Sequence, residues 1–384
     1  MHFFPHGRVF LDHGSGTPVD PSVVRVIREA YEEYPGNPIA VHSEGRRAKE
    51  ALESARKTIA LCCGVKKEHV IFTGSATEAN NLAILGIARH ALQEGKKAHI
   101  VTSTIEHIST LAVCEELFRE GAKVTYVPTT SSGLLDPKAV ADACTKETTL
   151  CTFGLVNSEI GVIQPIRKIR EMLMGGSCRP LIHIDAAQAP EYLSVHIHTY
   201  GADLMTLDAQ KVYGPKGIGA LIMSSPVPIT PVLYGAGQER GLRPGTENVP
   251  LALGFARALK IAEEGRREEK ERVQRLREML QNLLLEAAPN IRFNGSLKER
   301  VPNNLSLSIP SLNHSYLAVI LDARGVSVAT GSACTTEGER SHVLEALGNP
   351  DGALRVTLGR DTQERDIKAF VRVLTAVLAD FDRI

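Results

Sequence analysis

The sequence predicts an α/β fold built on a mostly parallel sheet, followed by a smaller α+β unit. In the first two thirds of the chain, apolar runs with strand character alternate with segments of helical character. The strand-like runs cover residues 99–102, 123–127, 150–153, 181–184 and 219–223, and helix-like stretches cover 78–92 and 109–121. Such alternation is typical of a parallel sheet that is covered by helices.

The character of the sequence changes near residue 258. Residues 258–287 carry many charges, with apolar side chains at about helical spacing, which predicts one long amphipathic helix. Short strand-like runs follow at 304–309 and 353–358, and a final helix is expected over 364–378. These elements predict the second, smaller α+β unit.

Charge and composition argue against several classes of partner. The chain has 384 residues, with 44 Lys and Arg against 44 Asp and Glu, so its formal net charge is zero. This balance predicts neither nucleic-acid binding nor binding to an anionic membrane. No run of about 18 apolar residues is present to span a bilayer. Residues 1–8 lack the apolar core of a signal peptide, so we expect a cytoplasmic protein.

The cysteines predict no metal site. There are seven, which is an odd number, and no Cys-x-x-Cys pair suggests zinc or a redox disulfide. Most are expected to be buried as small apolar side chains. Cys334 is the exception, because it lies in Gly331-Ser332-Ala333-Cys334-Thr335, where glycine and small residues allow a loop to move. A cysteine on such a loop is a candidate nucleophile.

Lys211 is the candidate for covalent attachment of an aldehyde cofactor. It lies at an expected strand end, in Asp208-Ala209-Gln210-Lys211, and a lysine there can hold an aldehyde as a Schiff base. Lys216, five residues further on, is a competitor.

Two further segments carry groups that could bind a ligand. Residues 72–81 predict a strand end, a glycine turn and a helix start, where free backbone N–H groups bind anions. An ordinary helix cap is the alternative. The apolar run 181–184 ends at Asp185, and a buried carboxylate requires a partner.

Together these features resemble the NifS/IscS-type cysteine desulfurases, which use pyridoxal 5′-phosphate (PLP). The resemblance extends from Phe10 to about Arg360 and includes the Arg-Pro-Gly-Thr-Glu-Asn run at 243–248. It implies the PLP-dependent transferase fold type I, which is aspartate-aminotransferase-like. It also implies a large PLP-binding domain at 17–258 and a small domain from 1–16 and 259–384, which carries the catalytic cysteine loop.

The resemblance implies roles around the cofactor ring. His107 would stack on the ring and shuttle protons, although a lone histidine after a strand is otherwise structural. Asn157 would hydrogen-bond the ring substituents, with a loop-capping role as the alternative. Asp185 would keep the pyridine nitrogen protonated, Gln188 would bind the phenolic oxygen, and Lys211 would form the Schiff base.

The resemblance also implies how the phosphate and the substrate are held. Ala76 and Thr77 would contact the phosphate, and Thr246 would reach the phosphate site of the neighbouring subunit in a homodimer. Arg355 would bind the substrate carboxylate, since a guanidinium makes two parallel hydrogen bonds with it. Asn37 would assist Arg355.

The sequence departs from the family beside Lys211. The family usually has Ser-x-His-Lys, whose Ser and His bind the phosphate, where this chain has Asp208-Ala209-Gln210-Lys211. If this segment is extended, Thr206, Asp208 and Gln210 share one face. Two unit charges about 4 Å apart repel by about 1 kcal/mol in water and about 4 kcal/mol at an effective dielectric constant of 20. Asp208 is therefore turned away, protonated, or a handicap to PLP binding.

The resemblance implies conversion of L-cysteine to L-alanine with a persulfide on Cys334, which a sulfur-acceptor protein or thiol then collects. Iron–sulfur cluster assembly is one destination of the sulfur, and the sequence does not identify the acceptor. One alternative is another PLP enzyme of this scaffold, such as a selenocysteine lyase or an aminotransferase. A second is a non-catalytic sulfur-relay or scaffold protein with impaired PLP binding.

Overall fold

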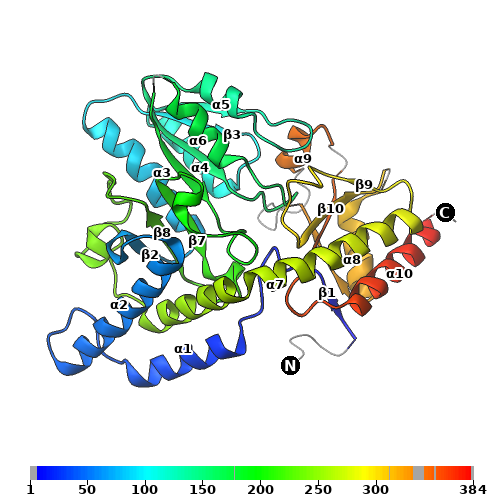
Figure 1. The fold of residues 1–384 in the computed structure, drawn as a ribbon, viewed down its shortest axis with the longest axis horizontal. Coiled ribbons are helices and arrows are strands. Elements are labelled where there is room, and N and C mark those ends of the chain that lie inside the picture. The colour runs from blue at the N-terminus through cyan, green and yellow to red at the C-terminus, as the bar shows by residue number, and fades with distance from the viewer. Residues whose placement is uncertain (1–6, 177, 311, 332–340, 350–351, 382–384) are drawn as a thin grey trace.

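A seven-stranded sheet forms the centre of the larger part of the molecule (Figure 1). The computed structural model describes residues 7–176, 178–310, 312–331, 341–349 and 352–381. The strand order is β2-β8-β7-β6-β5-β3-β4. The strands are β2 (Val70–Thr73), β3 (His99–Ser103), β4 (Lys123–Val127), β5 (Thr148–Gly154), β6 (Leu181–Asp185), β7 (Leu204–Asp208) and β8 (Gly219–Met223). Only β8 runs antiparallel to its neighbours in this sheet, which confirms the predicted α/β fold.

Helices cover both faces of this sheet because its strands are apolar on both sides. On β2, Ile71 packs on one face with α3 and α4, whereas Val70 and Phe72 pack on the other. That second face is covered by helices that include α2, α5, α6 and the first part of α7. The helices are α1 (Pro21–Glu33), α2 (Ser43–Cys63), α3 (Ala76–Gln93), α4 (Ile108–Arg119), α5 (Pro137–Ala143), α6 (Ile166–Met174) and α7 (Val249–Ala287). The described residues also form the short 3₁₀ turns η1 (Lys67–His69), η2 (Ile197–Thr199), η3 (Ala209–Lys211) and η4 (Gln238–Gly241).

The long helix α7 connects the two parts of the molecule (Figure 1). It has 39 residues and begins at Val249, nine residues before the predicted start, with Asn248 as its N-cap. Its first half packs with the large-sheet core and its second half with a separate apolar cluster. The helix passes through position 258 without a break, so the domain limits at 17–258 stay a prediction.

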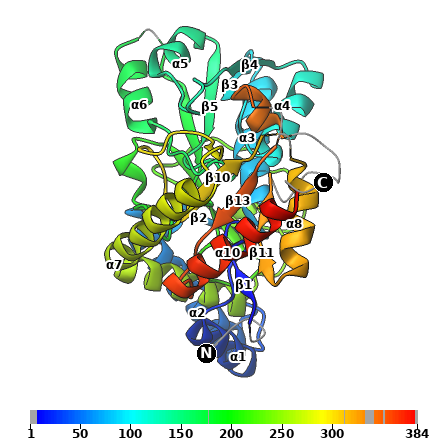
Figure 2. The same ribbon diagram turned by 90° about the vertical axis from the view of Figure 1, so that its right-hand side faces the viewer.

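The smaller part is an antiparallel sheet with the order β12-β13-β10-β9. Helices α8 and α10 pack beside it (Figure 2). The N-terminal strand β1 also lies in this part of the molecule, where it pairs with β11, a strand far from β1 in the sequence. The elements are β1 (Val9–Phe10), β9 (Arg292–Phe293), β10 (Asn304–Ser308), α8 (His314–Ala323), β11 (Val326–Ser327), β12 (Ala329–Thr330), α9 (His342–Ala346), β13 (Leu354–Thr357) and α10 (Glu364–Phe381).

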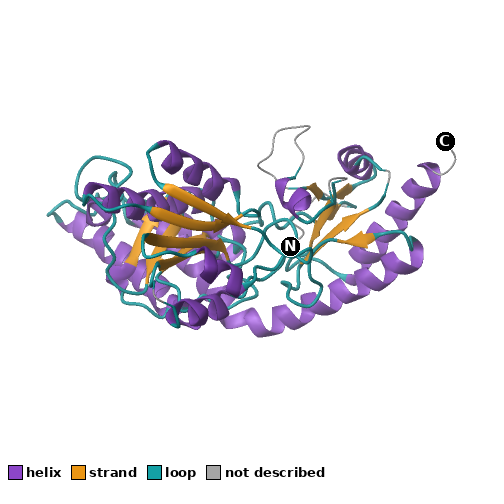
Figure 3. Ribbon diagram, turned by 90° about the horizontal axis from the view of Figure 1, so that it is seen from above, coloured by secondary structure: helices purple, strands orange, loops and turns teal. Residues whose placement is uncertain are grey.

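The parallel strands of the large sheet point their carboxyl ends toward the smaller sheet (Figure 3). Ligands of α/β proteins bind at this edge, where loops leave the strands. Within the described part of the chain, no helix is both long and apolar enough to cross a membrane.

Candidate active site

A pocket of about 1040 Å³, including its part open to solvent, lies at the carboxyl ends of β5, β6 and β7. It is lined by most of the residues that the sequence analysis selected. These are Ala76, Thr77, His107, Asn157, Asp185, Gln188, Asp208, Gln210, Lys211 and Arg355. Cys334 lies outside the described residues.

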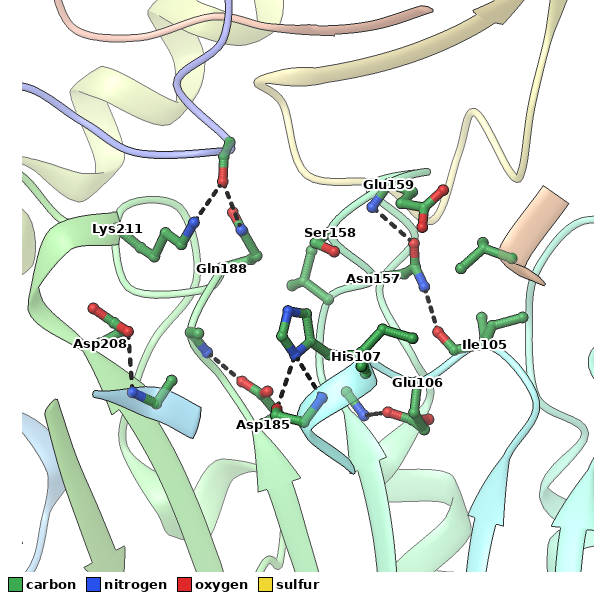
Figure 4. Close-up of a pocket in the computed structure, with 18 of the residues that line it drawn as sticks. Ile105, Glu106, His107, Asn157, Ser158, Glu159, Asp185, Gln188, Asp208 and Lys211 are labelled. Atoms are coloured by element: carbon green, nitrogen blue, oxygen red, sulfur yellow. Dashed lines mark hydrogen bonds between the residues drawn. The ribbon is translucent and has the colours of Figure 1, made fainter. Parts of the chain in front are cut away.

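Lys211 lies in the pocket, at the end of the 3₁₀ turn that follows β7. Its Nζ donates hydrogen bonds to the carbonyl oxygens of Gly14 at 2.9 Å and Ser15 at 2.7 Å. Gln188 Nε2 donates to the same Gly14 oxygen at 3.0 Å, so both side chains meet at one backbone carbonyl (Figure 4). The competing Lys216 is exposed and does not line this pocket. The geometry therefore favours Lys211 as the reactive amine.

Asp185 ends strand β6 and presents a carboxylate at the floor of the pocket (Figure 4). Its Oδ1 accepts the Ala187 N–H at 2.9 Å, and its Oδ2 accepts Asn80 Nδ2 at 2.8 Å. Asn80 Nδ2 also donates to Ser109 Oγ at 2.9 Å. These contacts fix the position of the carboxylate without placing a cation against it.

His107 is linked to this network through Ser109. The ring Nδ1 accepts the Ser109 N–H at 3.1 Å, as the N-cap of α4, and lies 2.8 Å from Ser109 Oγ. An Nδ1 that accepts a backbone N–H leaves the proton of the neutral ring on Nε2. Sequence reasoning missed Asn80 and Ser109, which hold Asp185 and His107 in place.

Glu106 is a second carboxyl group beside the pocket. It accepts hydrogen bonds from Ser103 Oγ and from the Gly154 N–H. Burial raises the pKa of Glu106 to about 7, against the opposing effect of these two donors. The group therefore changes its protonation near neutral pH next to His107.

Asn157 caps a loop at the pocket wall. Its Oδ1 accepts the N–H groups of Glu159 and Ile160, both at 3.0 Å, and its Nδ2 donates to the Ile105 carbonyl at 2.8 Å. These contacts support the loop-capping alternative, and a contact of Asn157 with a cofactor ring stays a prediction.

Glu159 connects this loop to the last part of the chain. Its Oε2 accepts Ser341 Oγ at 2.6 Å, and Ser341 is also the N-cap of α9. Burial raises the pKa of Glu159. His342, the first residue of α9, lines the pocket and contacts the Glu106 carbonyl at 2.9 Å. The sequence analysis assigned no role to Glu159, Ser341 or His342.

Arg355 lies on β13 with only 2% of its surface exposed. Its Nη2 donates to Asp12 Oδ1 at 3.0 Å and to Ser15 Oγ at 2.5 Å, and Nη1 donates to the Ser158 carbonyl at 3.2 Å. A substrate carboxylate would therefore share this guanidinium with Asp12. Asn37 is exposed and does not line the pocket, so the single chain does not bring it to Arg355.

Asp208 is not turned away from the anion site. Its Oδ2 accepts the Ala76 N–H at 3.0 Å, at the first residue of α3, and its Oδ1 accepts the Gln210 N–H at 3.0 Å (Figure 4). Because Asp208 caps the turn Ala209–Lys211, the chain leaves the extended conformation there. The expectation that Thr206, Asp208 and Gln210 share one strand face is therefore wrong for Gln210.

Comparisons with known proteins agree on one family. Residues 9–370 match the family model described as aminotransferase class-V. The chain is 35% identical to "Cysteine desulfurase IscS 1" of Archaeoglobus fulgidus over 374 residues, which covers 96% of each protein. A solved structure described as a NifS-like protein superposes with a TM-score of 0.91 at 32% identity, covering 97% of this chain and 99% of that one. Another, described as SspA in complex with cysteine, has a TM-score of 0.78 at 31% identity, covering 91% and 98%.

Proposed function

Since the chain belongs to the class V aminotransferase family and is a PLP-dependent cysteine desulfurase, we propose that Cys334 receives the sulfur of L-cysteine in the pocket that holds Lys211. One observation carries this proposal. Gly331 and Ser341 flank the segment that contains Cys334, and a Cβ placed on Gly331 would lie 3.7 Å from both Ser341 Cβ and Glu159 Oε2. Both ends of the segment therefore start at the pocket wall. Cys334 is three residues from Gly331. Because an extended chain spans at most about 3.5 Å per residue, this spacing limits the distance between Cys334 and Gly331.

The pocket fits PLP in the chemistry of its donors and acceptors. Lys211 supplies an amine, the Asp185 carboxylate can pair with a protonated pyridine nitrogen, and the Gln188 amide can bind a phenolic oxygen. The N-terminus of α3, at Ala76 and Thr77, supplies backbone donors for a phosphate. Asp208, whose carboxylate accepts the Ala76 N–H at the start of α3, disagrees with an anionic ligand. When bound, PLP would accept the electron pair that the substrate Cα releases.

Each of the residues named next has a separate role in the proposed reaction of L-cysteine. Arg355 binds the substrate carboxylate, and Lys211 removes the proton from Cα. The Cys334 thiolate attacks the substrate sulfur, so that an S–S bond forms as the Cβ–S bond breaks. Protons return to the three-carbon fragment, which leaves as L-alanine, and Cys334 keeps the sulfur as a persulfide. His107, which lines the pocket, is proposed to move protons in this reaction.

The active site is completed in a homodimer under this proposal. Thr246 is exposed and lies outside the pocket of its own chain, which is what a residue that reaches the phosphate site of a neighbouring subunit requires. Asn37 is exposed in the same way and is available to a neighbouring chain. Sulfur leaves Cys334 for an acceptor protein or a small thiol, and iron–sulfur cluster assembly is one use of it. A cytoplasmic location stays a prediction.

The location of the transferred sulfur tests this proposal directly. The protein is loaded with PLP, incubated with L-cysteine without reductant, alkylated, digested and analysed by mass spectrometry. We expect one additional sulfur atom on the peptide that contains Cys334 and none on the peptide that contains Cys178. Sulfur found on another cysteine, with the Cys334 peptide unmodified, would overturn the assignment.

A smaller effect is expected for Ser341→Ala. The change removes the hydrogen bond to Glu159 and the cap of α9, and loss of a cap typically costs about 1 kcal/mol. We expect the rate of alanine formation to fall by at most about fivefold, the ratio reached if all of this energy is lost from the reacting arrangement, with PLP binding unchanged. Ser341→Thr retains the hydroxyl and serves as the control. A rate equal to wild type in Ser341→Ala would show that this anchor does not limit the reaction.

A further inference from the structure

Asp208 places a carboxylate at the site where an anionic ligand is expected. It ends β7, is 5% exposed, and accepts the N–H of Ala76, the first residue of the 18-residue helix α3. A second backbone N–H, from Gln210, binds its other oxygen. Backbone donors at a helix N-terminus are the groups that bind a phosphate. The chain therefore supplies its own anion to a donor that the phosphate of PLP would use.

The charges around Asp208 do not neutralise it by direct pairing. Among the described residues, no ion pair includes Asp208. Lys211 favours the ionised form, whereas Asp185 opposes it. Glu78, in the first turn of α3, is occupied by Arg243 at 2.9 Å and by the Gly74 N–H. The other titratable groups that line the pocket are Glu106, His107, Glu159, His342 and Arg355.

We propose that Asp208 makes the phosphate site proton-dependent, so that the phosphate of PLP binds together with one proton on the Asp208 carboxyl. This inference rests on the proposed function, because it takes PLP as the ligand of the pocket. The ionised carboxylate competes with the phosphate for the Ala76 N–H and repels it. The protonated carboxyl carries no charge and offers an O–H donor to a phosphate oxygen, as a serine hydroxyl would at this position.

The direction of the pH dependence follows from proton linkage. Burial raises the pKa of Asp208 in the free protein, and the nearby phosphate raises it further in the complex. The complex therefore binds more protons than the separate partners at any pH between these two pKa values. Over this range, the affinity for PLP falls about tenfold per pH unit as the pH rises, and it is highest below the pKa of the free protein.

The test is equilibrium dialysis of PLP against the PLP-free full-length protein, from pH 5.5 to 8.5, for wild type and Asp208→Ser. The titration of free PLP is common to both proteins and cancels in the ratio of their Kd values. A change in the titration of Lys211, which interacts with Asp208, would alter the binding of pyridoxal as well as that of PLP. We expect wild type to bind more weakly than Asp208→Ser at pH 8, and the ratio to change about tenfold per pH unit. Pyridoxal, which lacks the phosphate, is expected to bind both proteins equally.

Two further variants exclude indirect causes. Asp208→Asn keeps the shape of the side chain without its charge and is expected to lose the pH dependence as Asp208→Ser does. Glu78→Gln alters another carboxylate at the start of α3, one paired with Arg243, and is expected to keep the wild-type slope. Calorimetry in two buffers of different ionisation enthalpy counts the protons, with about one more taken up by wild type than by Asp208→Asn.

Two outcomes would overturn the inference. One is an equal Kd for wild type and Asp208→Ser at every pH, and the other is an equal effect of the substitution on pyridoxal and PLP. Dialysis measures binding without turnover, so it separates this inference from the proposed function. A protein that binds PLP with the expected pH dependence but forms no persulfide would contradict the proposed function alone.

Discussion

Replacing Lys211 by alanine is expected to abolish alanine formation from L-cysteine, with a loss of at least about 10⁴-fold, because one side chain supplies both the covalent attachment and the proton transfer. The amine is held by the carbonyls of Gly14 and Ser15 at 2.9 and 2.7 Å, in the same pocket as Asp185. No other lysine lines that pocket among the described residues. The measurements are the rate of alanine release and the visible absorption of the protein after addition of PLP.

The matched control is Lys216→Ala. Lys216 lies five residues after Lys211, in Gly214-Pro215-Lys216-Gly217, but is exposed, and its loss is expected to leave the rate and the PLP spectrum unchanged. Two results would contradict the assignment of Lys211. One is a PLP spectrum in Lys211→Ala identical to that of wild type, and the other is loss of activity in Lys216→Ala with Lys211→Ala active.

The sequence predicted the residues expected around the cofactor ring better than it predicted the hydrogen-bond network that supports them. Lys211, Asp185 and Gln188 each follow a recognisable apolar run or belong to a local pattern, and all three line one pocket. Asn80 and Ser109 were missed as supporting residues, since a hydrogen bond between side chains on different helices leaves no periodic signal in the sequence. Such contacts depend on how the helices pack, which local patterns do not determine.

The segment around Asp208 shows a second limit. The alternation expected for an extended chain placed Gln210 on the face of Thr206 and Asp208, but the Asp208 side chain bonds the Gln210 N–H and starts a 3₁₀ turn. An aspartate whose side chain accepts the N–H two residues later favours a turn over continuation of the strand. This preference is local and does not appear in the alternation of apolar and polar residues. The mismatch with the family was visible in the sequence, whereas the contact with Ala76 required the fold.

Thr246, assigned to the phosphate site of a second subunit, and Asn37, assigned to assist Arg355, form a third case. Thr246 and Asn37 are exposed in the single chain, and the pocket does not include them. The predicted role of Thr246 depends on an assembly that one chain does not contain, and the predicted role of Asn37 beside Arg355 stays a prediction. If the proposed homodimer forms, a dissociated monomer is expected to have lower affinity for PLP than the dimer, and a Thr246→Ala dimer is expected to share part of this loss.

Replacing Cys334 by alanine is expected to reduce persulfide formation and alanine release by at least about 10³-fold, while PLP binding remains as in wild type. The substitution removes the only atom proposed to accept the sulfur, but leaves every described contact of Lys211, Asp185 and Gln188 in place. The two measurements are alanine release under reducing conditions and the Kd for PLP. Loss of a nucleophile with intact cofactor binding removes stabilisation that is specific to the transition state.

Cys334→Ser and Cys178→Ala complete this experiment. Serine retains the size of the side chain but is a far weaker nucleophile near neutral pH, so we expect it to be as inactive as alanine. Cys178 lies outside the pocket, and its replacement is expected to leave the rate unchanged. Full turnover in Cys334→Ala would mean that the sulfur passes directly to an external thiol. In that case the contacts of Glu159 with Ser341 would serve the structure of the pocket wall rather than the placement of a nucleophile.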